Sequence, residues 1–210
     1  MLNKISINAH SSVRIGASKT IYVDPFQLTE EKHDADFILI THPHYDHLSP
    51  EDFKKAAKDD TIYFVPESAK KEALEAGIPE AHLFTLNPGE DAEMPGITVG
   101  AVPAWNTRPY HQEIFRWVGY VISIDGWVIY VAGDTDAIEE NHGIKCDIAV
   151  VPVGGTYTMT AEEAADYINH IRPKYAIPSH YACLVGSHDD AKRFKANVKG
   201  ATEVVLKIAE

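Results

Sequence analysis

Short apolar runs bounded by turn residues make up most of the chain, a pattern that indicates β-strands more than long helices. The segment 36–41, Asp-Phe-Ile-Leu-Ile-Thr, is apolar through its middle and predicts a strand buried on both faces. Asp125-Gly126 predicts a two-residue hairpin between strands 118–124 and 127–132. The other predicted strands are 4–8, 13–16 and 20–24, as an antiparallel meander, and 61–65, 83–86, 97–104, 147–152, 175–177 and 203–208.

Capping residues predict four helices between these strands. Ser49 precedes a proline at a first helical position, Gly77 fits a helix end, and Thr160 begins a capping-box pattern with two glutamates. The predicted helices are 50–57, 67–76, 161–170 and, after Ser187 or His188, a last one to about 197. Because strands and helices interleave to both ends, residues 1–210 are predicted to form a single α/β domain.

Composition narrows the classes of function. The 210 residues contain 31 acidic and 19 basic side chains, and a net charge of −12 argues against a nucleic-acid partner. No apolar run approaches the roughly 20 residues of a membrane span, and the first residues do not form a signal peptide. A cytoplasmic protein without a membrane span is therefore expected. Two cysteines give no disulfide framework and no zinc motif, so carboxylates would have to join the eleven histidines in any metal site.

The densest polar cluster follows the buried strand at 36–41. Residues 41–48 read Thr-His-Pro-His-Tyr-Asp-His-Leu, so His42, His44, Asp46 and His47 lie within six positions. Pro43 disfavours a regular helix here, which predicts a loop anchored by a strand. Imidazole and carboxylate are the ligands expected of zinc or a similar divalent ion. The first two histidines could face one ion, and Asp46 with His47 could face a second.

This His-x-His-x-Asp-His segment resembles the signature of the metallo-β-lactamase-fold superfamily. The resemblance implies a four-layer αββα sandwich with one or two metal ions at an edge of its sheets. Two further segments fit the same family. Asp134 in Val-Ala-Gly-Asp-Thr resembles the aspartate that bridges the two metals, and His180, after Ala-Ile-Pro-Ser, resembles the last ligand.

One ligand position departs from the family pattern. The segment Val-Pro-Ala-Trp-Asn-Thr at 102–107 resembles a ligand strand, but Trp105 or Asn106 stands where a histidine is expected. Either His111 returns as a substitute ligand, or Asn106 makes a weak contact and the first metal site is depleted. The sequence leaves both open.

The N-terminal segments resemble a branch of the superfamily that includes ascorbate-phosphate lactonases and N-acyl-phosphatidylethanolamine phospholipases D. The matching features are His10 followed by serine and Asp24 followed by proline. Asp24 could orient a ligand histidine, or it could only form a turn. His10 could donate to a substrate in the pocket, or it could be a packed strand-end histidine.

The resemblance implies a metal-dependent hydrolase in which a metal-bound hydroxide attacks a small ester, lactone or phosphodiester. Zn²⁺ is the expected ion, one or two per chain, with Mn²⁺ or iron as alternatives. Asp46 and His10 are the candidate catalytic residues. Arg14, Arg108 and Arg116 could hold an anionic small-molecule substrate, and assembly into a homo-oligomer is compatible with the family. The alternative is a non-catalytic or weakly active metal-binding or assembly protein, whose metal site has decayed.

Overall fold

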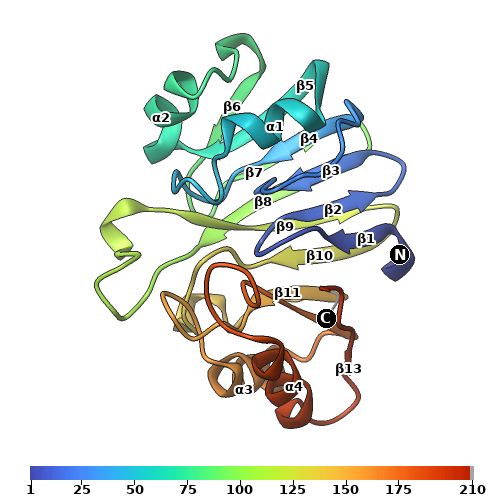
Figure 1. Ribbon diagram of the computed structural model, residues 1–210, viewed down its shortest axis with the longest axis vertical. Helices are drawn as coiled ribbons and strands as arrows, with labels where there is room; N and C mark the ends of the chain where they lie inside the picture. Colours follow the sequence, from blue (N-terminus) through green and yellow to red (C-terminus); the bar gives the residue numbers. More distant parts are fainter. Residues whose placement is uncertain (209–210) are drawn as a thin grey trace.

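The computed structural model describes residues 1–208 and consists of two stacked β-sheets with helices outside them (Figure 1). The first sheet has the strand order β1 (Ile5–Ile7), β2 (Val13–Gly16), β3 (Thr20–Val23), β4 (Ala35–Leu39), β5 (Ala57–Pro66) and β6 (Leu83–Leu86). The first three strands pair antiparallel, as predicted, and the pairs from β3 to β6 are parallel.

The second sheet repeats this plan with an antiparallel half and a parallel half. Its order is β13 (Glu203–Val204), β12 (Tyr175–Ser179), β11 (Ile148–Pro152), β10 (Trp127–Val131), β9 (Val118–Ile124), β8 (Ile97–Pro103) and β7 (Asp91–Met94). The pairs from β7 to β10 are antiparallel, and those from β10 to β13 are parallel. The predicted hairpin joins β9 and β10, and both of its turn residues, Asp125 and Gly126, have positive φ.

Four α-helices cover the outer faces of the sheets: α1 (Pro50–Ala56), α2 (Lys70–Glu75), α3 (Ala161–Ile171) and α4 (His188–Asn197). Short 3-10 turns cover Leu2–Lys4, Glu67–Ala69, Glu80–His82, Glu113–Phe115 and Glu139–Asn141. The predicted caps are present: Ser49 accepts a hydrogen bond from the Asp52 amide, and Thr160 forms a reciprocal capping box with Glu163. Within residues 1–208, every helix is too short or too polar to cross a membrane.

Three apolar cores separate four layers. The largest lies between the sheets and includes Val13, Leu39, Ile122 and Val150. A second core joins the second sheet to α3 and α4, and a third joins the first sheet to α1 and α2. Figure 1 shows α1 and α2 on one side of the sheets and α3 and α4 on the other. This is the predicted αββα sandwich.

The structure corrects the predicted elements in a few places. The strand β7 was not predicted, because its sequence Asp-Ala-Glu-Met carries only a weak alternation at a sheet edge. The predicted helix 67–76 is divided into a 3-10 turn and α2, and the last predicted strand is reduced to two residues. Ala57, predicted to end a helix, begins β5 instead. Each error falls at an element end or an edge, where tertiary contacts outweigh local propensity.

Candidate metal centre

All candidate ligands lie in loops that follow the carboxyl ends of strands. His10 follows β1, the segment 42–47 follows β4, His111 follows β8, Asp134 follows β10, and His180 follows β12. The strands β1, β3 and β4 point the same way, because two antiparallel pairs and one parallel pair connect them. The same reasoning applies to β8, β10 and β12 in the other sheet. Because the sheets are stacked, residues far apart in the sequence meet at one edge.

Unusual backbone conformations mark this edge. His10, Asp24 and His180 have φ values of 53°, 47° and 56°, which side chains with a Cβ rarely adopt. Such conformations cost of order 1–3 kcal/mol each and persist where surrounding contacts hold them. One such contact is a hydrogen bond of 2.9 Å from the His180 amide to the His10 carbonyl. Gly133, at φ 67°, supplies the turn that directs Asp134 towards the other loops.

Asp134 is the centre of the cluster. Its Oδ2 lies 3.1 Å from His180 Nε2 and 3.5 Å from His111 Nε2. Its Oδ1 lies 3.5 Å from His47 Nε2, and Oδ2 is 4.0 Å from His42 Nε2. The carboxylate is almost fully buried, so these imidazoles replace water around it. Asp134 therefore lies among four imidazoles at the centre of the cluster.

One group of possible ligands consists of His42, His44 and His111. His42 Nε2 and His44 Nδ1 are 3.1 Å apart, and both rings pack against Trp117. The His111 ring is only 2% exposed, so it is not a surface-loop histidine. Of the two readings that the sequence left open, the structure favours the one in which His111 returns to the cluster.

Asn106 has a different position from the one a ligand would take. Its side-chain oxygen accepts a short hydrogen bond from His111 Nδ1, and its amide nitrogen donates to Asp136 at 3.0 Å. Because Nδ1 of His111 carries the hydrogen, Nε2 keeps its lone pair towards Asp134. Asn106 is therefore a positioning residue for His111.

The second group of possible ligands consists of His10, Asp46, His47 and His180. His10 Nε2 lies 3.2 Å from Asp46 Oδ2, and the rings of His10 and His180 have centroids 3.7 Å apart. His47 Nε2 lies 3.6 Å from the same Asp46 oxygen. His10 is thus buried inside the cluster and is not only packed at a strand end.

Asp24 and Thr41 support the ligands from behind. Asp24 Oδ2 accepts hydrogen bonds of 2.7 Å from His47 Nδ1 and from the Thr41 hydroxyl. The Thr41 oxygen in turn accepts from His42 Nδ1 at 2.9 Å. Both histidines therefore donate from Nδ1, so that Nε2 is the atom that would face a metal ion, the arrangement that ligand histidines need. Asp24 has the orienting position that the sequence suggested.

The electrostatics keep most imidazoles neutral and the central carboxylate charged. Burial lowers the pKa of His111 to about 4 and lowers the pKa of His42 and His10. Burial opposes ionisation of Asp134, but the His180 and His47 imidazoles outweigh it and hold the pKa of Asp134 well below its usual value. Neutral imidazoles and ionised carboxylates are the forms that bind metal ions.

One feature of the structure, which does not depend on similarity to other proteins, indicates that these residues suit a divalent metal ion. Several buried side-chain atoms have no hydrogen-bond partner within the described residues: both ring nitrogens of His10, Nε2 of His47 and His111, Nδ1 of His180 and Oδ1 of Asp134. Buried polar atoms are normally paired, because an unpaired one costs about 1–3 kcal/mol. Of these atoms, Nε2 of His47 and Nε2 of His111 each lie 3.5 Å from the Asp134 carboxylate, an arrangement that a bound cation would complete.

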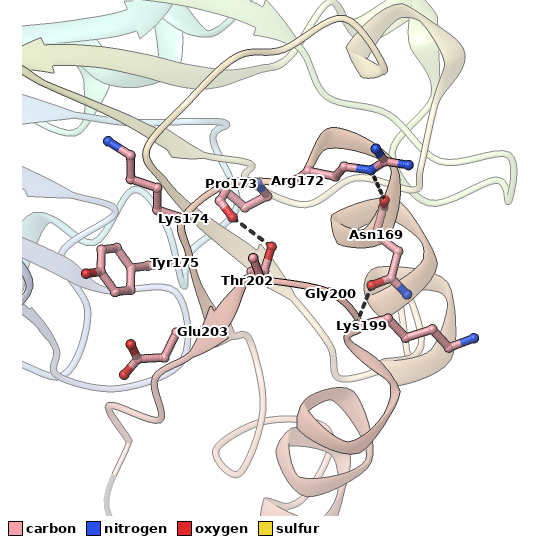
Figure 2. A pocket seen from close by; sticks show the side chains of 10 residues that line it. Asn169, Arg172, Pro173, Lys174, Tyr175, Lys199, Gly200, Thr202 and Glu203 are labelled. Atoms are coloured by element: carbon pink, nitrogen blue, oxygen red, sulfur yellow. Dashed lines mark hydrogen bonds between the residues drawn. The ribbon is translucent and has the colours of Figure 1, made fainter.

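The cluster opens into a pocket of about 590 Å³, which is lined by His10, His44, Asp46, His111, Asp134 and His180 together with apolar side chains. A larger cavity of about 750 Å³ lies at the other end of β12, beside Tyr175 (Figure 2). Its polar groups bond one another, as in the contact of 2.7 Å from the Thr202 hydroxyl to the Pro173 carbonyl. None of its lining residues within the described chain is a histidine, so we assign the chemistry to the smaller pocket.

All seven predicted ligands and His10 meet in this cluster, but the sequence did not indicate every residue that shapes it. Thr41 and Asp136 position ligand histidines, and Asp136 follows Asp134 closely enough to have been suspected. The tyrosines of the pocket mouth, Tyr45, Tyr110 and Tyr157, carry no sequence signal, because exposed aromatic residues are common in loops.

Comparisons with known proteins identify the family of this chain. A family model described as the beta-lactamase superfamily domain matches residues 4–180. A protein of Thermococcus onnurineus named UPF0173 metal-dependent hydrolase is 32% identical over 217 residues, which cover 97% of this chain and 95% of that protein. A protein of the same name from Thermoplasma acidophilum is 33% identical over 205 residues, covering 92% and 89%.

Solved structures have the same fold. A Parabacteroides distasonis protein assigned as a metal-dependent hydrolase superposes with a TM-score of 0.81 at 31% identity, covering 97% of this chain and 91% of that one. Igni18, a metallo hydrolase of Ignicoccus hospitalis, has a TM-score of 0.79 at 23% identity, with 96% and 93% covered.

Proposed function

Because this chain belongs to the beta-lactamase superfamily and is a metal-dependent hydrolase of that family, we propose that it cleaves a small ester, lactone or phosphodiester and carries one or two zinc ions. The observation that supports this proposal is the pair of unpaired, buried ring nitrogens, Nε2 of His47 and Nε2 of His111, that each lie 3.5 Å from the Asp134 carboxylate. A nitrogen-rich set with carboxylates suits zinc, and Mn²⁺ and iron accept the same ligands.

We assign the ligands to two neighbouring sites. His42, His44 and His111 would hold the first ion, and Asp46, His47 and His180 would hold the second, with Asp134 placed to contribute to both. Asn106, Thr41 and Asp24 fix the orientation of the rings from behind. The support from behind keeps Nε2 of three histidines directed at the centre without reorganisation during turnover.

When bound, divalent cations at such a site polarise the electrophilic oxygen and make water acidic enough to attack at neutral pH. Asp46 lines the pocket, and although burial opposes its ionisation, the hydrogen bond from His10 and the charge of His47 outweigh burial and hold its pKa below the usual value, so it is ionised and can orient a nucleophilic water. His10 also lines the pocket, and burial lowers its pKa; its Nε2 lies 3.2 Å from Asp46 Oδ2, so a substrate oxygen would compete with that carboxylate for the single ring N–H. Asp46 and His10, to which we give different roles, thus both line the same pocket.

The alternative function is a non-catalytic metal-binding or assembly protein. This alternative was based on the absence of a histidine near Asn106. Because His111 is buried in the cluster beside Asn106, the case for a decayed metal site is weaker. Turnover distinguishes the two: full metal loading without hydrolysis of any ester, lactone or phosphodiester would favour the binding protein.

The first test is the metal content of protein purified without chelators. We expect one or two divalent ions per chain, loss of hydrolysis on chelation, and recovery with zinc or manganese. Asp134→Asn should lower the metal content, whereas Asp60→Asn, which removes a carboxylate that is 82% exposed, should not. Less than one ion per chain, with no uptake during titration, would contradict the proposal.

Other features stay predictions. They are the single-domain organisation, a cytoplasmic location, homo-oligomerisation and the absence of a nucleic-acid partner. An anionic substrate would have to bind through the metal ions, because the three predicted arginines have other partners: Asp34 for Arg14, Glu163 for Arg108 and Asn87 for Arg116.

A further inference from the structure

The mouth of the metal pocket is apolar. Six of its lining residues, most of them exposed, form what we call the rim: Tyr45, Pro109, Tyr110, Tyr157, Leu184 and Val185. The histidines and carboxylates of the lining, all buried except His44, form what we call the floor. Tyr45 is 70% exposed and Leu184 is 43% exposed, so large apolar surfaces face solvent next to the cluster. An exposed apolar patch beside a polar centre is typical of a binding site.

The rim is built from loops that contact one another. Tyr110 and Tyr157 come from the loops after β8 and β11, and their rings pack edge to face with centroids 4.7 Å apart. Arg108 links the same loops by donating to the Gly155 carbonyl at 3.2 Å. On the β4 loop, Tyr45 packs on Phe26 with a centroid distance of 6.3 Å. The aromatic surfaces are therefore held in place before a ligand arrives.

The pocket also lacks positive side chains. Among its lining residues in the described chain, none is lysine or arginine, and the charged ones are the carboxylates of Asp46 and Asp134. An anionic group bound away from the metal ions would lose its hydration and meet no counter-charge. An alkyl or aryl group placed there would gain contact with the tyrosine and leucine surfaces.

From this rim and floor we infer that the substrate carries an uncharged alkyl or aryl group next to the scissile bond, and that substrates with a second, remote anionic group are rejected. This inference rests on the proposed hydrolase function and names its substrate class. The reacting carbonyl or phosphoryl group lies on the floor, and the uncharged group lies between the tyrosines and Leu184.

The test compares two esters with the same leaving group and chain length: 4-nitrophenyl hexanoate and the mono-4-nitrophenyl ester of adipic acid. The metal-loaded enzyme should have at least a tenfold higher kcat/KM for the hexanoate. From acetate to hexanoate, kcat/KM should rise by up to roughly fourfold per methylene, the value of burying each one. Equal or faster cleavage of the adipate ester would overturn the inference while leaving the hydrolase function intact.

A variant tests the rim directly. Leu184→Lys places a cation at the mouth, so it should reduce the preference for hexanoate and increase cleavage of the adipate ester. Leu206→Lys is the matched control, because Leu206 is 40% exposed and does not line the pocket. An unchanged preference in Leu184→Lys would contradict the placement of the uncharged group.

Measuring ligand binding without turnover tests this inference separately from the proposed function. In calorimetry, the metal-loaded protein should bind hexananilide, an uncleaved neutral analogue, with at least tenfold higher affinity than adipic acid monoanilide. If no ester or phosphodiester is cleaved but this preference holds, the hydrolase proposal fails and the apolar site stands. If neither anilide binds, or the anionic one binds as well, the inference fails.

Discussion

Asp24→Asn tests how much of the metal centre depends on a residue that would touch no metal. Asp24 is 1% exposed and accepts three hydrogen bonds: from the Thr41 amide at 2.8 Å, the Thr41 hydroxyl at 2.7 Å and His47 Nδ1 at 2.7 Å. Asparagine has the same shape but only one oxygen. One of the two faces of the side chain must therefore present an amide nitrogen to groups that now donate.

Each orientation of the asparagine side chain has its own consequence for stability or metal binding. If the amide nitrogen faces the Thr41 amide, a buried donor is left unpaired, which costs about 1–3 kcal/mol of folding free energy. If it faces His47 Nδ1, that nitrogen must become an acceptor, which moves the hydrogen of His47 to Nε2 and blocks the ligand atom. We expect the variant to lose about 10–100-fold in metal affinity, the usual effect of losing a partner behind a ligand.

The assay is a zinc titration against a competing chromophoric chelator, with urea unfolding of the metal-free protein measured beside it. Asp60→Asn is the control for loss of one charge, and its stability should stay within about 0.5 kcal/mol of the parent. If Asp24→Asn matches the parent in both zinc affinity and unfolding free energy, the orienting role of Asp24 is wrong.

Three further expectations follow from the same geometry. His111→Ala should lower the number of divalent ions bound per chain in elemental analysis, and an unchanged count would mean that His111 is not a ligand. Burial disfavours the charged form of His47, but Asp134 and Asp24 outweigh it and raise its pKa well above 6.5, so metal must displace a proton. Apparent zinc affinity should therefore rise with pH, by about tenfold per unit below that pKa, and a flat pH profile would refute this. Gly154→Ala should destabilise the protein by about 1–3 kcal/mol in urea unfolding, because its Cβ would lie 2.2 Å from the His180 carbonyl oxygen, whereas Gly143→Ala, with no atom within 4 Å, should not.

Local sequence patterns predicted several elements of the fold correctly. The two-residue hairpin at Asp125 and the capping box at Thr160 depend on neighbours in the sequence, and both were predicted correctly. The strand β7 was missed because only pairing with β8 makes Asp-Ala-Glu-Met a strand.

The candidate site divides in the same way. The spacing of His42, His44, Asp46 and His47 within one loop is a property of the sequence, and it indicated metal chemistry without any fold. By contrast, the role of His111 depended on a loop that returns over the cluster and on the contact with Asn106. No spacing rule could choose between those two residues, because the choice is made by burial and hydrogen bonding.

By itself, the sequence determined which chemical groups are present and that one loop after a buried strand carries four of them, since strand periodicity and loop composition are local. The family resemblance, and not the local patterns, implied that they gather at an edge of a layered fold. Only the tertiary structure decided which ring nitrogens converge on Asp134, because parallel strand ends from both sheets meet there. It also decided that tyrosines surround the mouth while the arginines bond elsewhere. Contacts such as those of Arg108 with Gly155 and of His180 with Asp134 join residues more than 40 positions apart, so their energies depend on the packed chain and not on any segment of it.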